Sequence, residues 1–387
     1  MPSRTASSRP SGRSAMDADT GRRRIGYVNL PAQFEEERAE ILQAVEGVFQ
    51  RGDFIGGAAV GKLEEELSAY LGSPHVVTLN SGTDALILAM RALDIGPGDE
   101  VITPPNSFVA STAAIIAVGA TPVFADVLPD QNIDPAAVEA AVTPRTKAIM
   151  PVHLTGRMAD MAPLMAIAAK HALAVIEDSA QAVGSTYDGR MSGTIGTFGC
   201  FSAHPLKNLN AAGDAGFLVT ADAELAARIR RLRNHGLINR SDVQEWGIVS
   251  RLDTLQAEVL RIRLRHLPSV IERRRRNAAQ YRAELAGLPL FIPPCRNIEF
   301  NTFHTFVVQT ERRNDFQKYL ADKGVETAIH YPVPIHLQPA ATHLGHGRGA
   351  FPVTERQADQ ILTLPINQFL SAADISYICA TAREYFA

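Results

Sequence analysis

The sequence predicts an α/β fold, in which a mostly parallel central sheet of seven strands is flanked by helices and followed by a smaller α+β domain. Seven short apolar runs bounded by Gly, Pro, Asp or Asn give the strands, at residues 75–80, 99–104, 121–127, 146–154, 173–180, 198–204 and 215–220. Helical patterns, such as residues 82–93 and 159–172, lie between the first five runs. Because the runs are apolar throughout rather than alternating, we expect helices to cover both faces of the sheet.

The pattern changes near Ser250. Residues 253–288 carry apolar positions at helical spacing with many Arg between them, which predicts a long solvated helix rather than a binding patch. A strand and two helices are expected after it, at residues 303–309, 314–324 and 373–386. We therefore predict a large domain over residues 26–255 and a small C-terminal domain over residues 256–387.

Composition limits the class of protein. The 387 residues, 46% of them hydrophobic, are enough to bury a large core. We expect no membrane partner, because no segment reaches the roughly 18 to 20 apolar residues that a membrane helix needs. The three cysteines are too few and too scattered for a disulfide framework or a metal site, so a cytoplasmic location without bound metal is expected.

The N-terminal segment, residues 1–25, is rich in Arg, Ser and Gly and has no apolar run. Such a segment cannot bury surface, so we expect a disordered tail. A transit peptide is the alternative, but the segment has almost no hydrophobic residues with which to form an amphipathic face. A nucleic-acid arm is not favoured either, because the rest of the chain is acidic and shows no basic stripe.

Lys207 lies between two apolar runs that are predicted to be buried strands. Most lysines face solvent, and one held between buried strands must lose its charge or find a partner. Attachment to a carbonyl cofactor as a Schiff base removes the charge. Upstream, Glu177 and Asp178 end another strand, where a carboxylate could simply cap a helix. Paired with Lys207, however, such an acid can keep a pyridine nitrogen protonated, which makes the ring an electron sink.

Ser81, Gly82 and Thr83 separate a predicted strand from a helix and present N–H groups and two hydroxyls to an anion such as a phosphate. The same pattern is the commonest helix N-cap, so both interpretations stay open. Phe108, near the start of the next helix, either packs in the core or stacks on a cofactor ring. Neither GxGxxG after the first strand nor GxxxxGK[ST] is present, which disfavours a nicotinamide oxidoreductase and a P-loop NTPase.

Taken together, these segments resemble the DegT/DnrJ/StrS family of sugar aminotransferases, which have the fold-type-I architecture of pyridoxal 5′-phosphate (PLP) enzymes. The resemblance runs from about Tyr27 to the C-terminus. It is carried, in order and spacing, by NSGTDAL, GPGDEVITP, VIEDSAQAVGS, FSAHPLKNLNAAGD, RNHG, SRLDTLQAEVL and HYPVPIHLQPA.

The resemblance implies roles for individual residues. Lys207 would form the Schiff base with PLP and then move the proton, Asp178 would pair with the pyridine nitrogen, and Gln181 would contact the phenolic oxygen. The remaining cofactor residues implied are Ser81, Gly82, Thr83 and Ser202 around the phosphate and Phe108 on the ring. His204 could assist proton transfer or contact substrate, and a packing or hydrogen-bonding role is equally possible.

The segment containing His330, Tyr331 and His336 is rich in proline and histidine, which suits a rigid loop lining a polar substrate channel. By family analogy, the enzyme would move an amino group from glutamate to a nucleotide-linked keto sugar, for amino-sugar biosynthesis, and would work as a homodimer. One alternative is a PLP- or PMP-dependent dehydratase; some relatives of that kind carry His in place of the lysine, so Lys207 counts against it. A PLP-binding regulator without turnover is the other.

Two positions depart from the family pattern. Val249 stands where family members usually have an Asn that reaches the phosphate of the neighbouring subunit, and a lost hydrogen bond of that kind would cost about 1.5–3 kcal/mol. Ala215 stands where a Gly is usual, and it would be strained if the turn required a positive φ.

Overall fold

The computed structural model describes residues 15–16 and 23–387. At its centre is a seven-stranded sheet with the strand order β3-β11-β10-β7-β6-β4-β5. Its strands are β3 (His75–Leu79), β4 (Glu100–Thr103), β5 (Thr121–Phe124), β6 (Thr146–Ile149), β7 (Ala174–Asp178), β10 (Phe198–Ser202) and β11 (Gly216–Thr220). Only β11 runs antiparallel to its neighbours, β10 and β3. The predicted α/β class and the mostly parallel seven-stranded sheet are therefore confirmed.

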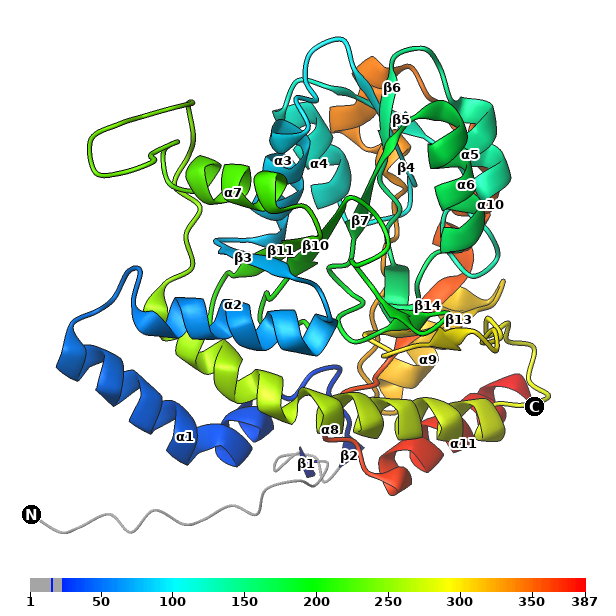
Figure 1. Cartoon of the computed structure of the whole chain (residues 1–387). Helices are drawn as coiled ribbons and strands as arrows, with labels where there is room; N and C mark the ends of the chain where they lie inside the picture. Colours follow the sequence, from blue (N-terminus) through cyan, green and yellow to red (C-terminus); the bar gives the residue numbers. More distant parts are fainter. Residues whose placement is uncertain (1–14, 17–22) are drawn as a thin grey trace, which may run out of the picture.

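Helices cover both faces of this sheet (Figure 1). One face packs against α3 (Gly82–Ala92), α4 (Ala110–Ala117) and α7 (Ala223–Leu232). The other face packs against α2 (Ala58–Leu71), α5 (Pro135–Ala141), α6 (Met161–His171) and the first half of α8 (Thr254–Glu284). Neighbouring strand residues point to opposite faces, so in β3 Val76 packs towards α2 and Val77 towards α3.

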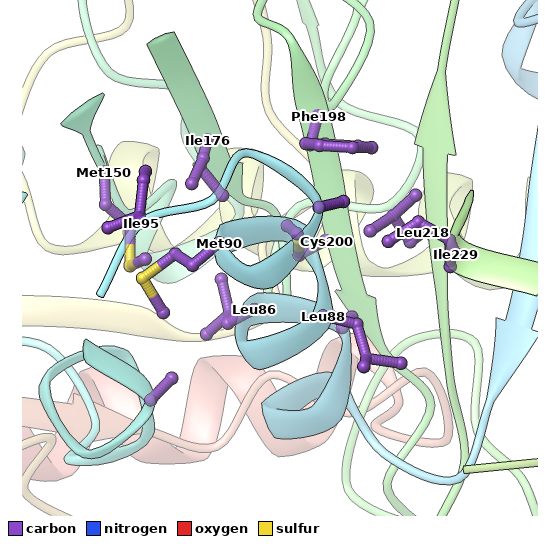
Figure 2. Packing of buried hydrophobic residues seen from close by; sticks show 14 of the residues in the cluster. Leu86, Leu88, Met90, Ile95, Met150, Ile176, Phe198, Cys200, Leu218 and Ile229 are labelled. Carbon is purple, nitrogen blue, oxygen red and sulfur yellow. The ribbon is translucent and has the colours of Figure 1, made fainter. Parts of the chain in front are cut away.

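The core beneath α3 shows why the strand runs are uniformly apolar. Leu86 and Met90 of α3 belong to one buried cluster with Ile176, Phe198 and Leu218 of three neighbouring strands (Figure 2). Fully burying an aliphatic or aromatic side chain of this kind stabilises the fold by about 1.5–3 kcal/mol. This packing fixes the N-terminal end of α3 against the edge of the sheet where the predicted site residues lie.

The small domain forms around the second half of α8. Its core contains a two-stranded antiparallel sheet covered by helices: β13 (Phe306–Gln309), β14 (Ile361–Leu364), α9 (Arg313–Asp322) and α11 (Ala372–Phe386). Along α8, Ile271 still packs in the large-domain core, whereas Ala278 packs in the small-domain core. The single helix α8 therefore contributes to both hydrophobic cores.

The last residues of the predicted tail are attached to the small domain. Arg23 donates a hydrogen bond of 2.5 Å to the Asp374 carboxylate, and Ile25 is buried beside Val325. Of the other tail residues, only strand β1 (Ala15–Met16) is described, and it pairs with β2 (Arg23–Arg24). The remainder of the expected tail lies outside the described residues.

The other elements complete the two domains. They are α1 (Leu30–Arg51), α10 (Pro352–Gln360), the short strands β8 (Thr186–Tyr187), β9 (Arg190–Met191) and β12 (Glu299–Phe300), and 3₁₀ helices at Leu154–Gly156, Ile335–Leu337 and Pro339–Leu344. Within the described part of the chain, no helix combines the length and the apolar character needed to cross a membrane.

Candidate active site

A cavity of about 370 Å³ lies at the carboxyl edge of the sheet, where the small domain meets it. Because the carboxyl ends of parallel strands share one edge, residues that follow β3, β4, β7 and β10 come together here. The predicted residues that line the cavity are Ser81, Gly82, Thr83, Phe108, Asp178, Gln181, Ser202, His204, Lys207, His330 and Tyr331. Only His336, among the predicted site residues, is absent from its walls.

Lys207 lies in the loop after β10, with its backbone N–H donating to the carbonyl oxygen of His204 at 2.8 Å. Burial lowers the pKa of its amine to about 8, although the Asp178 carboxylate acts in the opposite direction. A substantial fraction of the amine is therefore neutral near physiological pH, which is the form that can attack a carbonyl group.

Asp178 is the last residue of β7, and its carboxylate faces the same cavity. One carboxylate oxygen accepts a 2.7 Å hydrogen bond from the Ser111 hydroxyl, and the other accepts one of 3.2 Å from the backbone N–H of Ala180. These two bonds hold the carboxylate in a fixed orientation. Ser111, on α4, had no role assigned from the sequence.

Glu177 has a different task from its neighbour. Its fully buried carboxylate accepts hydrogen bonds from the backbone N–H groups of Gly193, Ile195 and Gly196 and lies 2.8 Å from a ring nitrogen of His153. The two acidic residues at the end of β7 therefore differ in role. Asp178 lines the cavity, while Glu177 anchors the loop that leads into β10.

Gln181 is oriented by the loop after β6. Its side-chain oxygen accepts a 2.8 Å hydrogen bond from the backbone N–H of Thr155, which leaves its amide N–H groups as donors. Tyr331 forms a hydrogen bond with Gln181, and this bond opposes the burial that raises the pKa of the Tyr331 hydroxyl to about 12. Gln181 therefore presents hydrogen-bond donors to the interior of the cavity.

The N-terminal end of α3 forms a cradle for an anion. Ser81 is its N-cap and accepts a 3.0 Å hydrogen bond from the backbone N–H of Asp84, and the N–H groups of the first turn have no partners within the helix. A Cβ atom on Gly82 would lie 2.7 Å from the Cβ atom of Ser202, so only glycine lets this turn approach β10. The cradle has the backbone donors and hydroxyls that a phosphate requires.

The rings of Phe108 and Tyr331 both line the cavity and contact each other, with 5.7 Å between their centroids and 44° between their planes. Phe108 is 54% exposed, so its ring is available to a planar ligand rather than absorbed in the core. His330 lies beside them and contacts the Thr363 hydroxyl at 3.0 Å. Burial lowers the pKa of His330 to about 4, so this ring is neutral at pH 7. His204 is exposed and accepts a hydrogen bond from the backbone N–H of Leu206.

The arrangement of a buried lysine, a facing carboxylate and a phosphate cradle meets the requirements of a PLP site. The model of the DegT/DnrJ/EryC1/StrS aminotransferase family matches residues 35–383. The chain belongs to this family. Solved members of the family include forms that carry PLP or PMP. The chain is therefore a PLP-dependent aminotransferase, as the sequence resemblance implied.

Individual relatives are similar over almost the whole chain. A dTDP-3-amino-3,4,6-trideoxy-alpha-D-glucose transaminase of Streptomyces venezuelae is 43% identical over 364 residues, which cover 94% of this chain and 96% of the relative. A UDP-N-acetyl-3-dehydro-alpha-D-glucosamine 3-aminotransferase of Acidithiobacillus ferrooxidans is 44% identical over 363 residues, 93% of this chain and 97% of the relative. The crystal structure of S. venezuelae DesV in complex with a ketimine intermediate superposes with a TM-score of 0.92 at 44% identity, covering 94% and 98% of the two chains. The fold-type-I expectation is thereby confirmed.

The two departures from the aminotransferase pattern differ in consequence. Ala215 is buried and does not adopt a positive φ, so the backbone strain considered from the sequence does not arise. Val249 is 50% exposed and does not line the cavity. Its neighbour Ser250 donates a 2.7 Å hydrogen bond to the Asp84 carboxylate and accepts one from the backbone N–H of Asn80. This segment therefore supports the phosphate cradle from within the same chain.

The structure does not support a substrate-binding role for His336. The residue is 1% exposed, its Nε2 atom lies 3.0 Å from the Glu355 carboxylate, and its ring packs on Phe351 and Phe124. The segment passes the cavity at His330 and Tyr331 and then turns away into a short 3₁₀ helix, which buries His336 elsewhere.

Further residues line the cavity that were not predicted as site residues, among them Tyr27, Arg274, His304 and Asn367. Two of them had a detectable signal. Arg274 occupies a position of α8 at which the helical spacing calls for an apolar residue, and His304 lies within the predicted small-domain strand at residues 303–309. Both positions become part of the site only because the small domain folds against the sheet edge.

Proposed function

We propose that this aminotransferase transfers an amino group from glutamate to a nucleotide-linked keto sugar. The observation that carries the proposal is the placement of Lys207 and Asp178 on one cavity with the cradle formed by Gly82 and Ser202. The sugar as acceptor is supported by the relatives that are named as transaminases of dTDP- and UDP-linked sugars.

The residues that would hold PLP follow from the geometry of the cavity. Asp178 would pair with the pyridine nitrogen, Gln181 would donate to the phenolic oxygen, and Phe108 would cover the ring. The phosphate would lie against the first turn of α3 and the Ser202 hydroxyl. When bound, PLP supplies an electron sink and carries the amino group between the two substrates.

Lys207 is proposed to anchor the cofactor and then, once displaced by substrate, to move the proton. An amine whose pKa is about 8 can both take up and return a proton near neutral pH, which suits a general acid–base group. Asp178 lines the same cavity as Lys207, and its carboxylate would pair with the ring nitrogen. His204, exposed at the rim, is proposed as an auxiliary group that contacts substrate.

The walls contributed by the small domain are proposed to bind the sugar. His330, Tyr331 and Asn367 offer neutral donors and acceptors, which match the hydroxyl groups of a sugar ring. A mostly enclosed cavity with a few convergent polar groups is typical of small-molecule sites.

We also propose that the enzyme is a homodimer and cytoplasmic. Large apolar side chains are exposed on the surface of the described chain, among them Trp246 (84% exposed), Phe49 and Ile55. Surfaces of this kind mark interfaces between proteins. The three cysteines form no disulfide, which agrees with a reducing compartment. Light scattering tests the assembly: a mass of twice 41.8 kDa supports the proposal, and an active monomer contradicts it.

The function is tested with the purified holoenzyme. Glutamate is expected to convert the visible spectrum of bound PLP to that of PMP, and a nucleotide-linked keto sugar is expected to restore it. Lys207→Ala should abolish both the initial spectrum and turnover, while Lys62→Ala, at an exposed position of α2, should change neither. If the Lys207→Ala spectrum is unchanged, or no keto sugar restores the PLP form, the proposal is wrong.

A further inference from the structure

Arg274 occupies an unusual position on α8. The buried stripe of this helix runs through Leu267, Ile271, Ala278 and Tyr281, and Arg274 falls at the expected spacing within it. The side chain is 8% exposed, although it belongs to a run of four consecutive arginines. One arginine of the run is thus turned into the interior, where it lines the active-site cavity.

The hydrogen bonds of Arg274 leave part of its guanidinium unused. Nη1 donates to the carbonyl oxygens of Phe303 at 3.3 Å and His304 at 3.1 Å, and Nη2 donates to the Gln368 side-chain oxygen at 3.2 Å. Within the described chain, the buried Nε atom has no hydrogen-bond partner. A guanidinium has five N–H donors, so Nε and one further N–H are left for a ligand.

The charge of Arg274 is also uncompensated. Burial lowers its pKa to about 10, which still leaves it positively charged at neutral pH. No carboxylate in the described residues forms an ion pair with it, whereas the buried Arg157 lies 3.4 Å from Asp130 and 3.5 Å from Glu299. A buried charge without a partner is costly, so an anionic ligand group would complete this site.

The groups around Arg274 do not supply that negative charge. Among the residues that the structure describes, only Tyr27 raises the pKa of Arg274, and burial raises the pKa of the Tyr27 hydroxyl itself well above its usual value. Burial lowers the pKa of His304 well below its usual value, and the nearby Lys207 and Arg274 cations add to that effect. Tyr27 and His304 therefore add no negative charge to the wall of the cavity near Arg274.

We propose that Arg274 binds a carboxylate group of the amino donor and makes the enzyme select donors that carry one. This inference rests on the proposed function. The phosphate of PLP would lie in the cradle of Gly82 and Ser202 on the large domain, so it would not need this arginine. A guanidinium with free N–H groups matches a carboxylate in shape and charge. The donor carries that carboxylate in as an amino acid and out as the corresponding keto acid.

The test separates the two halves of the reaction in the holoenzyme. Arg274→Gln should raise the glutamate concentration needed for half-maximal formation of PMP by roughly 10- to 100-fold, the loss expected for hydrogen bonds to a charged group. Return of the PMP form to PLP by the keto sugar should stay at the wild-type rate. Calorimetry with glutarate, an unreactive dicarboxylate, should show binding to the wild type and none to Arg274→Gln.

Two controls separate loss of carboxylate binding from loss of folding. Arg276→Gln removes an exposed arginine of the same run and should behave as wild type in all three measurements. Because Arg274 also bonds to the Phe303 and His304 carbonyls, its substitution could disturb folding. The wild type is therefore also assayed with the two monoamides of glutamate, glutamine and isoglutamine. For at least one of them, the concentration needed for half-maximal formation of PMP is expected to be about 10-fold or more higher than for glutamate.

Other outcomes overturn the inference. One is equal reactivity of glutamate and both monoamides in the wild type. Another is a selective loss of the keto-sugar half-reaction in Arg274→Gln, because that result would assign the guanidinium to a phosphate of the acceptor. Failure of the proposed function is recognised separately. In that case no keto sugar restores the PLP form of the wild type, while glutarate binding still depends on Arg274.

Discussion

The carboxylate of Asp178 and the amine of Lys207 face one cavity and act on each other electrostatically. Burial lowers the pKa of the lysine and the carboxylate raises it, with a net value of about 8. Two hydrogen bonds, from Ser111 and from the backbone of Ala180, fix the carboxylate in that position. Burial thus sets the direction of the pKa shift of the lysine, and a residue on a neighbouring strand limits its size.

This relationship predicts the pH dependence of PLP binding to the apoenzyme. Only the neutral amine attacks the aldehyde, so the rate should rise as the pH increases through about 8 and level off above it. Asp178→Asn removes the carboxylate that raises the pKa of Lys207, so this pKa should fall. The curve of binding rate against pH should therefore move to lower pH. Stopped-flow absorbance after mixing with PLP measures both curves, and a shift to higher pH would contradict the assignment.

Ser111→Ala should weaken catalysis without unfolding the enzyme. The substitution removes one of the two hydrogen bonds that orient the Asp178 carboxylate, a bond to a charged group that contributes about 1.5–3 kcal/mol. We expect kcat to fall by roughly 10- to 100-fold with little change in KM for glutamate. Steady-state kinetics gives kcat and KM, and a melting curve of the same variant gives its stability. A normal kcat with a lowered melting temperature would show that Ser111 has a purely structural role.

Gly82→Ala should weaken binding of the cofactor. Its new methyl group would lie 2.7 Å from the Cβ atom of Ser202 and would push α3 away from β10, widening the phosphate cradle. We expect the dissociation constant for PLP to rise by at least about 10-fold, as measured by equilibrium dialysis. Gly61→Ala is the matched control, because nothing lies within 4 Å of its added methyl group. It should leave PLP affinity unchanged and stabilise α2 by about 0.5–1 kcal/mol.

His336→Ala should lower stability and leave substrate affinity alone. The side chain is buried against Phe351 and bonded to Glu355, so its loss leaves a cavity and removes one of the hydrogen-bond partners of that carboxylate, which keeps those from the backbone N–H groups of Gly349 and Phe351. We expect the free energy of unfolding to fall by about 2–4 kcal/mol in denaturant titration. A raised KM at unchanged stability would instead restore the substrate role that the sequence suggested.

The seven strands could be predicted because each has a local signal, whereas most of the cofactor residues were inferred from the family resemblance and stay a prediction. Uniformly apolar runs predicted the seven strands, and the chemistry of Asp178 and Lys207 follows from their places beside those runs. Other features depend on how distant segments meet. His330 and His336 belong to one proline-rich segment, and only the turn between them decides which one faces the cavity. Arg274 is one of four consecutive arginines, and its position around the helix axis, which composition does not reveal, turns it inward.

The predicted division of the chain into two domains stays a prediction, and the sequence of α8 shows why. One continuous helical pattern covers α8, and no sequence signal marks the place where its buried face passes from the core around Ile271 to the core around Ala278. The residues just before Tyr27 were assigned to the tail because their composition is polar. Their order comes from long-range partners, such as Asp374 for Arg23.

The central claim is that Lys207 carries the cofactor, and one measurement tests it directly. Borohydride reduction of the holoenzyme, followed by proteolysis and peptide mass spectrometry, identifies the lysine that bears the phosphopyridoxyl group. We expect the modification on the peptide that contains Lys207, at close to one group per chain. Modification of a different lysine, or no modification of an enzyme that still turns over, would contradict the account.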